Sequence, residues 1–139
     1  NKNIKYSLFD TEIVSLLQYY YLKQNNLNVG FNNNKKIVLK NKINKTDNFY
    51  KKNSLFIANW SFSETPLNFR KKISYIMKNY QYILICFQEK FENINNKNYF
   101  FKIKKRLKKQ YKVNIILNKY YKGSIFKRQN HYFFIAERL

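Results

Sequence analysis

Two short, continuous apolar runs constrain the fold of this 139-residue chain more than any other feature. They are Leu55-Phe56-Ile57-Ala58 and Tyr82-Ile83-Leu84-Ile85-Cys86-Phe87. Between them Thr65 and Pro66 give a strong helix-start signal, with Thr65 as the N-cap and Pro66 at the first helical position. A strand, a helix and a second strand in this order predict a parallel pair joined by a crossover helix.

The segments on either side continue this alternation. Apolar periodicity predicts helices over residues 11–24 and 98–111, and Asp10 or Thr11 can cap the first of them. Further strands are expected at 4–9, 54–60 and 82–87, and residues 113–117 and 131–136 read as an antiparallel pair joined by a loop that contains Gly123. We therefore expect one α/β domain over residues 1–139, with a mostly parallel sheet and helices on both faces.

The formal net charge of +21 has two interpretations. A basic excess normally indicates a polyanionic partner such as nucleic acid. However, 24 of the 28 basic residues are Lys and four are Arg, in a chain dominated by residues with AT-rich codons. Since phosphate recognition tends to use Arg as well as Lys, we favour codon bias over a functional basic face.

Several classes of protein and site are disfavoured. Cys86 is the single cysteine, which excludes an intrachain disulfide and a Cys-rich zinc site. His131 is the single histidine and the seven carboxylates are scattered, so we expect no metal site. No apolar run is long enough to span a membrane and no signal-peptide pattern occurs, so a cytoplasmic location is expected. The first residue is Asn and not Met, which suggests the C-terminal portion of a longer chain.

Three segments resemble a known family. They are residues 56–67 (FIANWSFSETPL) with Arg70 following, residues 82–96 (YILICFQEKFENINN), and Tyr6-Ser7-Leu8-Phe9-Asp10 followed by Tyr19-Tyr20-Tyr21-Leu22. These are similar to bacterial sugar O-methyltransferases. The resemblance implies a Rossmann-like methyltransferase sheet, S-adenosylmethionine as cofactor, and a saccharide hydroxyl as acceptor.

The chain departs from the family pattern in two ways. Glu12 stands where the family usually has a proline. The glycine-rich turn after the first strand, which wraps the methionine end of the cofactor, has no counterpart, since the chain contains only Gly30 and Gly123. These residues are therefore expected to form only part of a cofactor site, as in a fragment of the enzyme.

The resemblance also implies roles for individual residues, because ligands of open α/β sheets bind outside the carboxyl ends of the strands. Asp10 would bind the cofactor ribose, with a helix-capping role as the alternative. Glu64 and His131 are candidate general bases, although Glu64 also suits a helix N-terminus and a lone histidine is more often structural. The acceptor pocket would be lined by Asn59, Trp60, Ser61, Ser63 and Gln88, with core packing as the alternative for Trp60.

The basic segment Lys102–Lys112 supports a different hypothesis, a noncatalytic RNA- or ribosome-associated protein. Against it, Ile103 and Leu107 have the spacing of an ordinary amphipathic helix, and no RNA-binding signature accompanies the lysines. A third possibility is a methyltransferase remnant that works as an interaction module. We favour the methyltransferase.

Overall fold

The computed structural model describes residues 4–42, 51–119 and 129–139, so the predicted loop around Gly123 lies outside the described residues. The chain divides into two compact units, Asn1–Lys45 and Thr46–Leu139, called here the N-terminal and C-terminal units. Each is described by itself, and the expectation of one domain over residues 1–139 stays a prediction.

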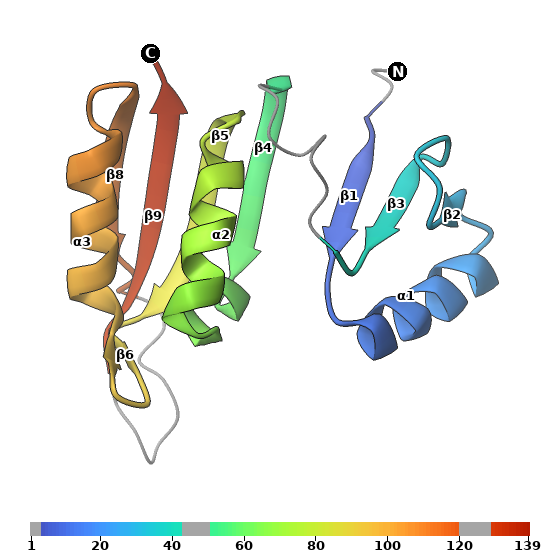
Figure 1. The fold of residues 1–139 in the computed structure, drawn as a ribbon, viewed down its shortest axis with the longest axis horizontal. Coiled ribbons are helices and arrows are strands. Elements are labelled where there is room, and N and C mark those ends of the chain that lie inside the picture. Colours follow the sequence, from blue (N-terminus) through green and yellow to red (C-terminus); the bar gives the residue numbers. More distant parts are fainter. Residues whose placement is uncertain (1–3, 43–50, 120–128) are drawn as a thin grey trace. The chain divides into compact units, whose positions relative to one another are not determined.

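The N-terminal unit is a small sheet with one helix. Strand β1 (Tyr6–Phe9) leads into α1 (Glu12–Gln24), followed by β2 (Val29–Gly30) and β3 (Ile37–Lys40) (Figure 1). Both β1 and β2 pair with β3 in parallel. The strands supply a small core, in which Val29, Val38 and Leu39 are buried. The apolar stripe of α1 is exposed instead, at Ile13, Leu16, Leu17, Tyr20 and Tyr21.

The C-terminal unit contains two further helices. Strand β4 (Lys51–Asn59) is followed by the 3-10 turn η2 (Ser61–Glu64), α2 (Leu67–Met77) and β5 (Tyr80–Gln88). A short hairpin, β6 (Lys90–Phe91) and β7 (Ile94–Asn95), then precedes α3 (Asn96–Leu107), β8 (Tyr111–Leu117) and β9 (His131–Arg138).

The strand pairing corrects the predicted fold class. The expectation of a Rossmann-like, mostly parallel methyltransferase sheet is wrong, because the described strands form three separate small sheets. Of their six pairings, three are parallel and three are antiparallel. In the largest sheet, of order β4-β5-β9-β8, only β4 and β5 are a parallel pair. Strand β9 lies between β5 and β8 and is antiparallel to both, which the alternation of strands and helices along the sequence does not specify.

The prediction of helices on both faces is also wrong for this sheet. Helices α2 and α3 lie on the same face (Figure 1). On that face β5 buries Ile83, Ile85 and Phe87, whereas Tyr82, on the opposite face, is 40% exposed. Neighbouring β4 residues Leu55 and Ile57 are 49% and 55% exposed. An uninterrupted apolar run therefore does not show that both faces of a strand are covered.

Aromatic rings join α3 to the sheet. The rings of Phe100 (α3) and Phe87 (β5) are stacked with centroids 4.1 Å apart, and Phe134 (β9) lies 5.9 Å from Phe100. Such pairs add stability beyond the burial of their area. The hydroxyl of Tyr111 lies 2.7 Å from the carbonyl oxygens of both Lys78 and Tyr80, which fixes the start of β8 against the α2–β5 turn.

The start of α2 differs in detail from the prediction. Pro66 is the N-cap residue, one position later than expected. The Thr65 hydroxyl donates to the carbonyl of Phe62 at 2.9 Å and does not cap the helix. Thr65 therefore closes the η2 turn, and this turn positions the candidate site.

Candidate functional site

The turn after β4 has an unusual backbone conformation at its first residue. Trp60 adopts φ 56° and ψ −38°, a region that bulky residues rarely enter. Its N–H donates to the carbonyl of Cys86 at 2.8 Å, and its own carbonyl accepts from the N–H of Ser63 at 2.7 Å. Backbone strain of this kind costs about 1–3 kcal/mol and clusters at functional sites. The turn is therefore a candidate position for ligand binding.

The indole of Trp60 contacts His131 directly. Its Nε1 donates to Nδ1 of His131 at 3.0 Å, and His131 is 7% exposed. Burial lowers the pKa of His131 from its usual value, so the ring is neutral at pH 7. A neutral ring that accepts at Nδ1 carries its proton on Nε2. To act as the predicted base, His131 would have to give up the indole hydrogen bond.

A second set of hydrogen bonds orients Glu64. The side-chain amide of Gln88 donates to Oε1 of Glu64 at 3.0 Å, and its Oε1 lies 2.8 Å from the hydroxyl of Ser63. Ser63 and Gln88 are buried, whereas Glu64 is exposed. The carboxylate of Glu64 is thus held by a buried amide and faces solvent.

Arg70 holds the η2 turn in place through hydrogen bonds to its carbonyl groups, and it was not among the predicted site residues. It is fully buried, and its guanidinium donates to the carbonyls of Thr65 and Ser63 and to Oδ1 of Asn96, the first at 2.7 Å. Burial is the main cause that lowers the pKa of Arg70, although the side chain stays charged at neutral pH. Arg70 lies three residues before Ile73 and seven before Met77, and this helical spacing is the sequence pattern that places Arg70 on the buried face of α2.

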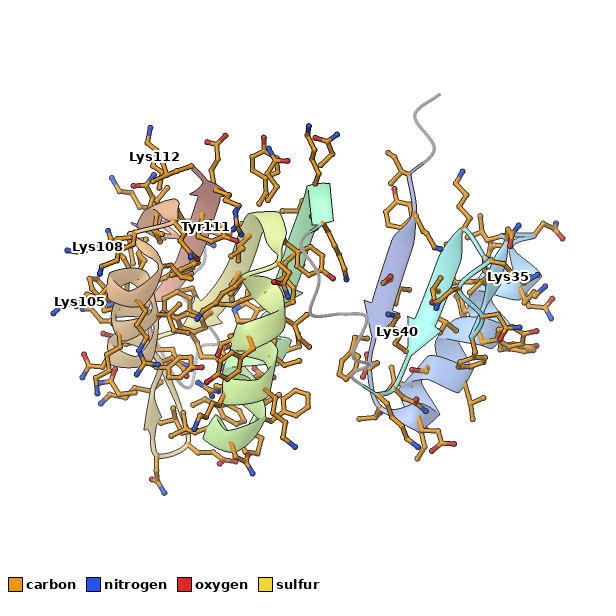
Figure 2. All side chains as sticks on the ribbon, turned by 45° about the horizontal axis from the view of Figure 1, so that its top comes forward. Lys35, Lys40, Lys105, Lys108, Tyr111 and Lys112 are labelled. Carbon is orange, nitrogen blue, oxygen red and sulfur yellow. The ribbon has the colours of Figure 1, made fainter. Side chains whose placement is uncertain are left out.

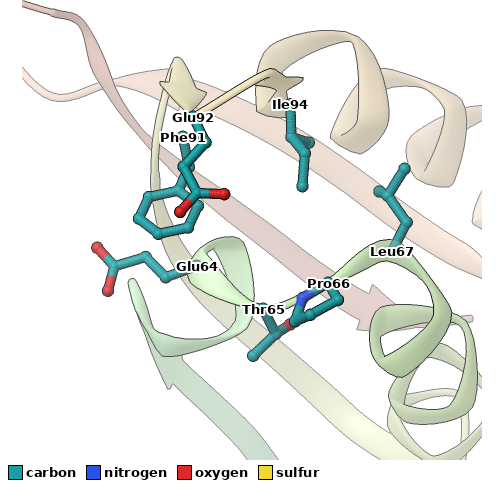
Figure 3. A pocket seen from close by; sticks show the side chains of 7 residues that line it. All are labelled: Glu64, Thr65, Pro66, Leu67, Phe91, Glu92 and Ile94. Carbon is teal, nitrogen blue, oxygen red and sulfur yellow. The ribbon is translucent and has the colours of Figure 1, made fainter.

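An open hollow of about 440 Å³ lies beside Glu64. Figure 3 shows the side chains of Glu64, Phe91 and Glu92 on one side of it and Leu67 on the other. Glu92 sits at φ 48° in the turn between β6 and β7, so the hairpin brings a second carboxylate and the Phe91 ring to this place. The complete lining is Glu64, Thr65, Pro66, Leu67, Phe91, Glu92 and Ile94.

The structure brings most of the predicted acceptor residues together. Two hydrogen bonds near the end of β5 join them: Trp60 donates to the candidate base His131, and Ser63 bonds to Gln88. Gln88 also holds Glu64, and Glu64 is the member of this group that lines the hollow. Asn59 and Ser61 are exposed at the end of β4 and the start of η2. The hairpin residues Phe91, Glu92 and Ile94 were missed, because strands of two residues show no periodicity.

Asp10, the predicted ribose ligand, belongs to the N-terminal unit and lies between the end of β1 and the start of α1. Its carboxylate accepts from the N–H of Thr11 at 2.8 Å and from the Gln18 amide at 3.3 Å, but the N-cap residue of α1 is Thr11, and no side chain makes a capping hydrogen bond there. Among the described residues, Gly30 is the one glycine, and it lies in β2 with no glycine-rich turn around it. Both oxygens of the Asp10 carboxylate thus accept hydrogen bonds from the N-terminal unit itself, and the described residues include no glycine-rich turn to hold the methionine end of S-adenosylmethionine.

Within the described ranges, no group of three or more His, Cys, Asp or Glu side chains comes close enough to hold a metal ion. No described helix combines the length and the apolar character needed to cross a membrane.

Comparison of the chain with protein-family models, curated proteins and solved structures gives no match.

Proposed function

We propose that the C-terminal unit binds a neutral saccharide in the hollow between η2 and the β6–β7 hairpin, as the acceptor of an S-adenosylmethionine-dependent O-methyltransferase. The observation that carries the saccharide part is the pair of carboxylates, Glu64 and Glu92, beside the Phe91 ring around one hollow. The methyl-transfer part rests on the resemblance to sugar O-methyltransferases, and it concerns the reaction and not the fold.

The chemistry of the hollow suits a hydroxyl-rich ring. Ionised carboxylates are hydrogen-bond acceptors only, so they suit the several O–H donors of a sugar. An aromatic face suits the apolar C–H face of the same ring. The volume of about 440 Å³ falls within the range of small-molecule sites. Two negative charges in one place disfavour an acidic sugar, which is why the ligand is proposed to be neutral.

Glu64 is the residue with the most defined role. The amide of Gln88 holds one carboxylate oxygen at 3.0 Å, which leaves the other oxygen to accept from a saccharide hydroxyl. Because Gln88 is itself buried and contacts Ser63, the position of Glu64 is fixed before a ligand arrives. Preorganisation of this kind lowers the entropic cost of binding.

The saccharide part is tested on an array of immobilised neutral and acidic glycans with the full chain. We expect binding to a subset of neutral glycans, weakened about tenfold by Glu64→Gln, which removes a charge-assisted hydrogen bond. Glu137→Gln is the matched control, since it removes the same charge from an exposed residue of β9. Equal binding by Glu64→Gln, or no bound glycan at all, would contradict the proposal.

The cofactor part has a separate test, calorimetric titration of the full-length product of the gene with S-adenosylhomocysteine. Micromolar binding that Asp10→Ala weakens would support methyl transfer. No heat of binding from the well-folded full-length protein would remove the methyl-transfer part and leave the saccharide part standing.

A further inference from the structure

The outward side of α3 and the turn after it carry a dense group of positive charges. Seven of the eleven residues from Lys102 to Lys112 are basic, against 28 of 139 in the whole chain. No acidic residue occurs in α3, whose sequence is NKNYFFKIKKRL. We define the α3 basic face as the exposed residues Lys102, Lys105, Arg106, Lys108 and Lys109.

Codon bias alone does not explain this grouping. The same bias acts on α1, a helix of 13 residues in which Lys23 is the single basic residue. The helix dipole favours cations in the last turn of α3, which accounts for Lys105 and Arg106. Lys102 lies a full turn earlier and gains little from that effect.

The helix geometry directs these charges away from the core. Lys102, Lys105 and Arg106 have the i, i+3, i+4 spacing of one helix side, and Lys108 and Lys109 follow in the turn after α3. The opposite side is buried at Phe100, Ile103 and Leu107. Figure 2 shows Lys105 and Lys108 projecting outward from α3. Phe101 lies next to Lys102 and one turn before Lys105, and its ring is 42% exposed.

We propose that the α3 basic face binds single-stranded nucleic acid through the phosphodiester backbone, without sequence preference, and that Phe101 stacks on a base. Lysine is a compact point charge that suits phosphates, whereas base-edge reading relies on the fork of arginine, here present once, at Arg106. A cationic surface beside an exposed aromatic ring is the combination found in single-strand binders. This proposal uses none of the residues around the hollow.

Two other polyanions fit less well. An interfacial membrane helix needs a free apolar face, but the apolar side of α3 is buried against the sheet. A sulfated glycan offers charge but no base for Phe101.

The test is fluorescence anisotropy of a labelled oligouridylate with the full chain, over a range of salt. The triple variant Lys102→Gln, Lys105→Gln, Lys109→Gln should lower affinity about 100-fold at about 0.1 M salt and reduce the salt slope by about 2. The matched control Lys52→Gln, Lys71→Gln, Lys72→Gln removes the same charge from exposed residues of β4 and α2, outside the α3 basic face, and should cost less than about threefold because salt screens charges that do not contact the strand. Thermal melting verifies that both variants are folded.

Phe101→Leu separates base stacking from charge. It should weaken oligouridylate and oligothymidylate binding about tenfold and leave a duplex of equal length unchanged. Equal losses of oligouridylate affinity in the two triple variants would overturn the proposal, because they would show that the net positive charge of the chain, and not the α3 basic face, attracts the strand. An unchanged affinity of Phe101→Leu for single strands, or competition by phosphatidylserine vesicles as strong as that by oligouridylate, would also overturn it.

Discussion

The indole Nε1 of Trp60 donates to Nδ1 of His131 over 3.0 Å, and this bond joins residues 71 positions apart in the sequence. Trp60 follows β4 and His131 begins β9, while β5 lies between these two strands in the sheet. The two rings also meet edge to face, with centroids 6.0 Å apart. The contact therefore ties the turn that carries Glu64 to the far side of β5.

Removing the indole donor should destabilise the C-terminal unit. Trp60→Phe keeps an aromatic ring but loses the hydrogen bond to the buried His131, which should lower the free energy of unfolding by about 1–2 kcal/mol. Urea denaturation measures the change. Tyr75→Phe, at a 59% exposed position of α2, is the control and should stay within about 0.5 kcal/mol. A loss no larger than that of the control would show that the bond contributes nothing.

The stability of the chain should fall as the pH falls through the titration range of His131. Burial lowers the folded-state pKa of this residue, so below the ordinary value of about 6.5 the unfolded chain binds the proton more readily. The stability gained by keeping His131 neutral is fully present above about pH 6.5, and it is lost as the pH falls through the lower pKa of the folded state.

The pH prediction is measured by urea denaturation at neutral and mildly acidic pH. The wild type should lose more free energy of unfolding than His131→Gln, which has no group that titrates there. Carboxylates titrate in both proteins, so their effect cancels in the comparison. Parallel pH profiles would mean that His131 is as accessible to protons in the folded chain as in the unfolded one.

Arg70 should be among the least replaceable residues of the turn. Arg70→Met leaves three acceptors, two of them on the buried residues Ser63 and Asn96, without their charged donor and should cost about 3 kcal/mol of unfolding free energy. Arg70→Lys should also be destabilising because one ammonium cannot reproduce the fork. Lys72→Met removes the same charge from an exposed position of α2 and should be close to neutral. Chemical denaturation of the three variants tests this order, and equal stability of Arg70→Met and Lys72→Met would refute it.

Neighbouring phenylalanines of α3 offer a test of the core. Phe100 is fully buried against Phe87, whereas Phe101 is 42% exposed. Phe100→Ala should cost about 3–5 kcal/mol because it leaves a cavity, and Phe101→Ala should cost less than about 1 kcal/mol. Thermal melts of both variants rank the two costs. A larger loss of stability for Phe101→Ala would mean that α3 packs on the sheet through a different face.

The sequence located the helices and the longer strands well, but it did not predict their arrangement. Helices expected at 11–24 and 98–111 are found at Glu12–Gln24 and Asn96–Leu107, since 3.6-residue periodicity is a strong signal. Strand direction and sheet faces depend on contacts distant in sequence. Ile57, inside an apolar run, is therefore 55% exposed, and β9 inserts between β5 and β8.

The candidate site was predicted in part for the same reason. Gln88 ends β5 and Glu64 lies in the turn after its parallel neighbour β4, so their proximity could be expected. Glu92 reaches the hollow through a two-residue hairpin and a positive φ of 48°, for which the sequence gives no signal. Arg70 was overlooked because a charged helix residue is normally exposed.

The most direct test of the proposed function is to map where a neutral saccharide binds. The best ligand from the glycan array is titrated into the ¹⁵N-labelled full chain while amide chemical shifts are recorded. The proposal predicts shifts concentrated at residues 61–67 and 91–95, with a titration midpoint about tenfold higher in Glu64→Gln. Shifts elsewhere in the chain, or none at saturating saccharide, would contradict a saccharide site in this hollow.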